Sequence, residues 1–190
     1  MNFTIFEPKS NIDLEKFVRF WSKYYGYKGY KWEELYTNAI SKPKLDPQDV
    51  HKLFFWKNGV RLSKKKAMLV DKIVSRIDIV NKLRGNFNQD IFDKEFNFIK
   101  GAIWKIFLLH VIDKYRFPIF DQYVYYACSF LKDGEMKKMP LANVTKMKFY
   151  YEVYINFFND LVERGVDRKK LDEALWAFGK FLKSPYGYRI

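Results

Sequence analysis

The sequence predicts an all-α protein of eight or nine helices. Apolar residues recur at helical spacing through most of the chain, as Phe17, Val18 and Trp21 do near the N-terminus. No segment alternates apolar and polar residues with period two, which is the pattern of a half-buried strand. Glycines fall where the helical patterns end, for example at Gly59 and Gly165. All three observations favour helices over a sheet.

The length of 190 residues suits one domain with a sizeable core. We therefore predict a single all-α domain over residues 1–190, with two lobes around a cleft as the alternative form. The chain has no internal repeat and no low-complexity tract, and no stretch of its sequence reads as an inter-domain linker.

Start and stop signals predict the helices of the first half. An N-cap with a matching acidic residue three positions later, an Asp-Pro start or a closing glycine marks most of these helices. The expected helices run from Ser10 (with Asp13 completing a capping box) to Gly26, from Lys31 to Ser41, from Asp46-Pro47 to Lys57, from Ser63 to Arg84, and from Asn86 or Asn88 to Ile99.

A long basic helix is expected between Ser63 and Arg84. The segment from Arg61 to Arg84 carries eight basic and two acidic residues, which is +6 of the chain's net charge of +13. Met68, Leu69, Ile73, Ile77 and Val80 are expected to face inward, leaving the lysines on an outer stripe. This stripe is either a solvated surface or a face that contacts phosphates. The candidate nucleic-acid-binding residues are Lys64, Lys65, Lys66, Lys72 and Arg76.

The most apolar run, Ile103 to Ile112, predicts the most buried helix of the protein. Ten residues are too few to span a bilayer. The helix is expected to begin after Gly101 and to end near Tyr115, before Pro118. Asp121 then caps a second helix, Gln122 to Leu131.

Two more helices are expected in the last third of the chain. Asp133-Gly134 and Pro140 mark a surface loop, and Asn143 or Thr145 begins a long helix that ends at Glu163, before Gly165. Asp167 caps the final helix, which Ser184-Pro185 ends.

Composition favours a polyanionic partner, with DNA as the expected one and no membrane. Lysines outnumber arginines 27 to 8, which argues against detailed reading of base edges. A codon bias toward AT-rich triplets is a competing source of the basicity. The sequence does not specify an oligomeric state.

Several classes of site and location are excluded or disfavoured. The single Cys128 forbids an internal disulfide and fits a reducing cytoplasm, and MNFTIFEPKS lacks the pattern of a signal peptide. Two histidines and one cysteine cannot assemble a conventional zinc site, so no metal is predicted. No phosphate-binding glycine loop or nucleophile elbow is present, and no cofactor is predicted.

Two short segments resemble the helix-hairpin-helix (Gly-Pro-Asp) DNA glycosylase superfamily, in particular its 8-oxoguanine-glycosylase-like members. The segments are Gly101-Ala102-Ile103-Trp104-Lys105 and Pro118-Ile119-Phe120-Asp121-Gln122-Tyr123-Val124. The resemblance implies a helix-hairpin-helix glycosylase-like bundle in which Gly101 approaches a DNA phosphate, Lys105 attacks the sugar and Asp121 stabilises the transition state. It thereby implies a base-excision repair enzyme, a DNA glycosylase/lyase that acts on damaged or modified bases.

The residues also admit an alternative, a non-catalytic helical module that binds nucleic acid or protein and keeps the glycosylase-like fold. Ile103 stands where the hairpin's second glycine is expected. Lys105 shares a face with Leu108, Leu109 and Ile112, so its amine is either desolvated and reactive or extends along its stem to water. Asp121 is a helix cap whether or not it is catalytic. His110 is expected to be a hydrogen-bonded core histidine.

Overall fold

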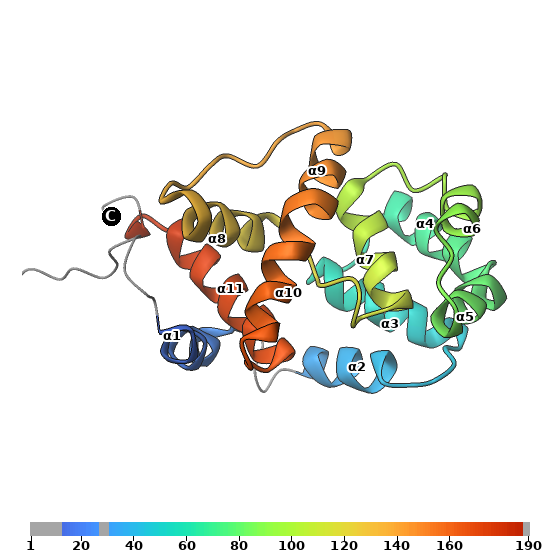
Figure 1. Cartoon of the computed structure of the whole chain (residues 1–190). Helices are drawn as coiled ribbons and strands as arrows, with labels where there is room; N and C mark the ends of the chain where they lie inside the picture. Colours follow the sequence, from blue (N-terminus) through green and yellow to red (C-terminus); the bar gives the residue numbers. More distant parts are fainter. Residues whose placement is uncertain (1–12, 27–30, 188–190) are drawn as a thin grey trace, which may run out of the picture. The chain divides into compact units, whose positions relative to one another are not determined.

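The computed structural model describes residues 13–26 and 31–187, and every regular element in these ranges is a helix (Figure 1). The predicted all-α class is confirmed. Counting α9, a π-helical turn and α10 as one continuous helix, the described ranges contain ten helices. None of these helices has the length and apolar character needed to cross a membrane.

The chain divides into two compact units, which we call the middle unit (Tyr27–Phe117) and the terminal unit (Met1–Gly26 with Pro118–Ile190). The helices of the middle unit are α2 (Lys31–Ile40), α3 (Pro47–Asn58), α4 (Lys64–Val74), α5 (Ile77–Gly85), α6 (Gln89–Glu95) and α7 (Ala102–Ile112). The terminal unit contains α1 (Leu14–Trp21), a 3-10 turn (Ser22–Tyr24), α8 (Gln122–Asp133), α9 (Asn143–Phe149), a π-helical turn (Tyr150–Tyr154), α10 (Ile155–Glu163) and α11 (Arg168–Leu182).

Short polar side chains start the helices largely where the sequence predicts. Asp46 forms a reciprocal capping box with Asp49 at the start of α3, and Gly59 ends that helix in the left-handed conformation. Each of α4, α6, α8 and α11 begins with a side-chain oxygen that accepts a hydrogen bond from a backbone amide of the first turn; these oxygens belong to Ser63, Asn88, Asp121 and Asp167. Asp13 itself caps α1, and the predicted Ser10 start lies outside the described residues.

The prediction of one long helix from Ser63 to Arg84 is wrong, because this segment forms two helices. α4 ends at Val74, Arg76 leaves the helical conformation with φ −117° and ψ 26°, and α5 begins at Ile77. Side chains satisfy the freed Lys72 carbonyl, which accepts hydrogen bonds from Ser75 Oγ (2.9 Å) and the Arg76 guanidinium (3.1 Å). No glycine or proline marks this break, so local sequence signals do not predict it.

Helix α7 is the core of the middle unit, as predicted. Every side chain from Ile106 to Ile112 is buried. The helix ends three residues before the expected Tyr115, because the Asp113 carboxylate accepts hydrogen bonds from the Tyr115 and Arg116 amides and forms a turn.

In the terminal unit, α11 packs closely on the first turn of α8. A Cβ built on Gly179 would lie 1.8 Å from the Tyr123 carbonyl oxygen, so only glycine permits this approach. Tyr150 and Tyr154, on the π-helical turn between α9 and α10, fill the remaining core, and the Tyr150 hydroxyl donates to the Pro118 carbonyl (3.0 Å).

Candidate nucleic-acid interface

Helix α4 carries an exposed lysine face in the middle unit. Lys72 follows Lys65 by seven residues and Lys64 by eight, so the three side chains lie within about 100° of one another around the helix. All three are exposed, and within the described residues none of them forms an ion pair. The acidic residue of this helix, Asp71, lies 3.5 Å from His51 Nε2 instead. We call Lys64, Lys65 and Lys72 the α4 lysine face.

The inward side of α4 differs from the prediction at two positions, Met68 and Val70. Val70 and Ile73 are buried, but Met68 is 54% exposed and lies among the lysines. Met68 is four residues from both Lys64 and Lys72, so a helix that turns those lysines outward must turn Met68 outward with them. The expectation that Met68 faces inward is therefore wrong.

Lys66 lies on the opposite side of α4 from the α4 lysine face, on the side of the buried Val70 and Ile73, and is already engaged. Its ammonium donates to Asn58 Oδ1 (2.5 Å) and lies 5.4 Å from the centre of the Trp104 ring. It thus ties α4 to the end of α3 and the start of α7. A phosphate contact by Lys66 would compete with these interactions.

Arg76, at the break between α4 and α5, makes several intramolecular contacts. Its guanidinium stacks 4.7 Å from the centre of the Phe98 ring and donates to the Lys72 carbonyl. The Glu95 carboxylate lies 4.0 Å from its Nε. These contacts leave Arg76 less available to a phosphate than the exposed lysines.

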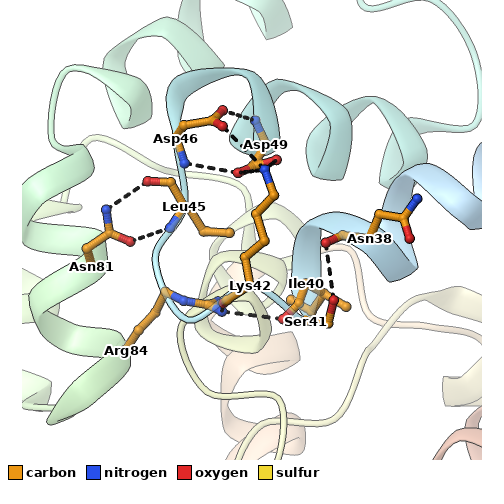
Figure 2. A network of polar contacts seen from close by, with 9 residues as sticks. All are labelled: Asn38, Ile40, Ser41, Lys42, Leu45, Asp46, Asp49, Asn81 and Arg84. Carbon is orange, nitrogen blue, oxygen red and sulfur yellow. Dashed lines mark hydrogen bonds and ion pairs between the residues drawn. The ribbon is translucent and has the colours of Figure 1, made fainter.

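Arg84, the last basic residue of the segment from Arg61 to Arg84, makes its contacts within the middle unit. Figure 2 shows its guanidinium directed at the segment between α2 and α3. It donates to the carbonyls of Ile40 (3.3 Å) and Lys42 (2.5 Å), and also to the carbonyl of Val111 at the end of α7. The guanidinium thus lies at the carboxyl ends of two helices, α2 and α7, where partial negative charge accumulates. Burial lowers the pKa of Arg84, and the nearby Asp49 charge opposes that shift.

The same segment is fixed by two further contacts. Lys42 makes a bidentate ion pair with the Asp49 carboxylate (2.6 and 2.8 Å), whose side chain is only 1% exposed (Figure 2). The Asn81 side chain donates to the Leu45 carbonyl and accepts from the Leu45 amide (Figure 2). A buried carboxylate requires such a charged partner. This network stabilises the fold and is not an open binding surface.

Gly101 and Lys105 lie in the first turn of α7. Gly101 is exposed and N-caps the helix with an ordinary backbone conformation, and a Cβ built on it would meet no atom within 4 Å. The Lys105 side chain is 21% exposed, and its ammonium lies 2.6 Å from Asp93 Oδ1 on α6 and 5.5 Å from the centre of the Phe92 ring.

Asp93 is the partner of Lys105 that sequence reasoning missed. Partial burial works to raise the pKa of Asp93, but hydrogen bonds from Lys105 and Gln89 outweigh it, and the pKa lies below its ordinary value. Asp93 is therefore a carboxylate at neutral pH and a weak base. Twelve residues and a helix boundary separate the pair, so no local pattern indicates it.

Asp121 belongs to the terminal unit, whereas Lys105 belongs to the middle unit. Asp121 Oδ1 accepts hydrogen bonds from the amides of Tyr123 (2.8 Å) and Val124 (3.2 Å), which confirms the predicted cap of α8. Two amide donors hold the carboxylate in one orientation.

His110 is a core residue, as expected. Its Nδ1 lies 2.8 Å from the Phe117 carbonyl, and its Nε2 lies 2.7 Å from the Tyr36 hydroxyl. A carbonyl only accepts, so Nδ1 carries the hydrogen, and in the neutral ring Nε2 accepts from Tyr36. Among residues 13–26 and 31–187, no three His, Cys, Asp or Glu side chains are grouped so as to hold a metal ion.

Comparison of the chain with protein-family models, characterised proteins and solved structures gives no significant match in any of the three.

Proposed function

We propose that this chain is a DNA-binding helical protein that holds the phosphate backbone on the α4 lysine face. The observation that carries the proposal is the exposure of Lys64, Lys65 and Lys72 on one side of one helix without acidic partners. Ammonium groups in this arrangement release condensed counterions when they neutralise phosphates, which favours binding.

The position of the lysines in α4 supports a functional role. Lys64, Lys65 and Lys66 occupy the first turn, where the helix dipole disfavours positive charge. A helix start is better served by acidic residues, as at Asp49 in α3. Residues that break a local stability rule are often retained for function.

The kind of recognition follows from the residue type. Lysine is a flexible point charge, whereas the arginine fork is the usual reader of guanine edges. Arg76 and Arg84, two of the three arginines in the basic segment from Arg61 to Arg84, are both engaged in intramolecular contacts. We expect contacts to phosphates with little dependence on base sequence.

The test compares two triple variants with the same loss of charge. Lys64→Ala/Lys65→Ala/Lys72→Ala removes the α4 lysine face, and Lys23→Ala/Lys132→Ala/Lys138→Ala removes three exposed lysines of the terminal unit. Duplex affinity is measured by fluorescence anisotropy over a range of salt concentrations. The α4 variant should lower the slope of log K against log salt by about 3, at roughly 0.9 per phosphate contact. Equal effects of the two variants, or no binding by the parent protein at low salt, would overturn the proposal.

A DNA glycosylase/lyase activity is the second candidate, within the same DNA-binding function. Two observations support it: the Asp121 carboxylate is held at the start of α8, and the Lys105 ammonium is partly exposed near the glycine that opens α7. In this mechanism Lys105 attacks the sugar carbon, and Asp121 stabilises the positive charge that develops there. It requires both side chains to line one cleft.

The ion pair between Lys105 and Asp93 supports the alternative, a non-catalytic module. A nucleophilic lysine must be able to approach the sugar carbon, and the Lys105 amine is instead held 2.6 Å from the Asp93 carboxylate. Chemical trapping decides between the two.

A further inference from the structure

Helix α11 presents a stripe of lysines and an aromatic residue in the terminal unit. Lys169, Glu173, Trp176, Lys180 and Lys183 follow one another at spacings of three and four residues, so they share one side of the helix. Lys180 and Lys183 are exposed, and Trp176 is half-buried. The stripe extends over roughly 20 Å, at about 1.5 Å per residue.

Aromatic rings from two other segments flank the stripe. The Trp176 ring makes edge-to-face contacts with Tyr25 (5.4 Å between centres) and with Tyr123 on α8 (5.3 Å). A lysine ammonium group lies over each of the three rings. The distances from Nζ to the ring centre are 4.9 Å for Lys180 and Trp176, 5.7 Å for Lys183 and Tyr123, and 5.7 Å for Lys169 and Tyr25. Tyr25 is buried, so the surface itself consists of the half-buried rings of Tyr123 and Trp176 next to Lys180 and Lys183.

The charge of this surface is positive. The acidic residue of the stripe, Glu173, is buried and is neutralised by Lys170 (3.3 Å) and Lys169 (3.8 Å). Within the described residues neither Lys180 nor Lys183 forms an ion pair, and the hydrogen bond of Lys183 goes to the neutral Gln122 side chain (3.1 Å). An anionic partner is thus electrostatically favoured.

We propose that the surface formed by Tyr123, Trp176, Lys180 and Lys183 binds single-stranded nucleic acid. Unpaired strands offer both phosphates for the ammonium groups and free base faces for the rings, whereas a duplex offers mainly its phosphates. When Lys180 moves from the indole to a phosphate, the ring face that it covered accepts a base. This site is separate from the α4 lysine face, and its chemistry does not depend on that face.

The test measures binding of an unstructured oligothymidylate and of a hairpin duplex by fluorescence anisotropy. The variants are Lys180→Ala/Lys183→Ala, with Lys132→Ala/Lys138→Ala on α8 and the following loop as the control of equal charge. The first double variant should reduce the salt slope for the single strand by about 1.4, at roughly 0.7 per phosphate, and should leave duplex binding nearly unchanged. An effect no larger than that of the control would overturn the proposal.

A second variant tests the stacking step. Trp176→Leu should weaken oligothymidylate binding roughly fivefold or more, and Trp176→Phe, which keeps a ring, should restore most of it. Thermal unfolding verifies that both variants are folded at the assay temperature. Equal affinities of the Leu and Phe variants would exclude stacking. The α4 triple variant separates the two sites: if it alone abolishes single-strand binding, the α11 proposal fails while the proposed function stands.

Discussion

The Lys105 ammonium lies 2.6 Å from the Asp93 carboxylate, and this ion pair determines what the first turn of α7 can do. It holds the Lys105 side chain against α6 and the Phe92 ring. A role in phosphate binding is compatible with the charge of the ammonium group, whereas covalent catalysis requires the pair to separate.

Borohydride trapping tests the chemistry. If Lys105 is the nucleophile, oligonucleotides with oxidised, alkylated or deaminated bases should give a covalent adduct under reduction, and Lys105→Ala should abolish it. Asp93→Asn should increase adduct formation, because it removes the carboxylate that holds the ammonium. No adduct and no base release with any of these lesions would reject the enzyme and retain the non-catalytic module.

Arg84→Lys should destabilise the protein without altering DNA binding. A lysine ammonium cannot reach the carbonyls of Ile40, Lys42 and Val111 together, and leaving one of them unpaired costs about 2 kcal/mol. The free energy of unfolding is measured with urea, and Arg61→Lys, at an exposed arginine of the same unit, is the control. A change in the salt slope of DNA binding would show instead that Arg84 contacts DNA phosphates.

Substitution by alanine should affect the free energy of unfolding strongly at Gly179 and only weakly at Gly101. Gly179→Ala should lower the free energy of unfolding by about 3 kcal/mol or more, because the new Cβ collides with the Tyr123 backbone. Gly101→Ala should lower it by no more than about 1 kcal/mol, since that Cβ meets open space and only the weaker N-cap preference of alanine opposes the change. Should DNA approach Gly101 closely, the alanine variant will bind duplex more weakly while remaining fully folded. Unchanged affinity would remove Gly101 from the interface.

Cys128 should be unreactive in the folded protein. Burial raises the pKa of its thiol to about 12, so at pH 8 only about one thiol in ten thousand is ionised. Labelling by a thiol reagent at pH 8 should be no faster than unfolding, and it should be rapid in concentrated guanidinium chloride. Rapid labelling under native conditions would contradict the burial of Cys128.

The same pKa shift has a consequence for stability. The unfolded thiol ionises near its ordinary value of 9.0, whereas the folded thiol keeps its proton to about 12. The contribution of Cys128 to the free energy of unfolding is therefore fully present below pH 9 and decreases as the pH rises above it. Cys128→Ala should remove this part of the alkaline destabilisation, as measured by urea unfolding at several pH values.

The sequence by itself determined the helical class and most helix starts. Asp46 with Pro47, Ser63, Asn88, Asp121 and Asp167 each cap the helix predicted for them. The burial of α7 also followed from its apolar run. These features are local, because a cap binds amides two or three residues away and an apolar run needs only to be covered.

Only the tertiary structure decided the roles of the charged side chains. Arg84 and Lys64 belong to one basic segment, yet Arg84 binds carbonyls more than 25 residues away and Lys64 is exposed. Lys105 likewise pairs with Asp93 on another helix, and Arg76, at the break between α4 and α5, contacts Phe98 and Glu95. A long cationic side chain reaches water or a distant partner equally well from the same backbone position. The outcome depends on which carbonyls and carboxylates the packing of helices brings within its reach, and the local sequence does not contain that information.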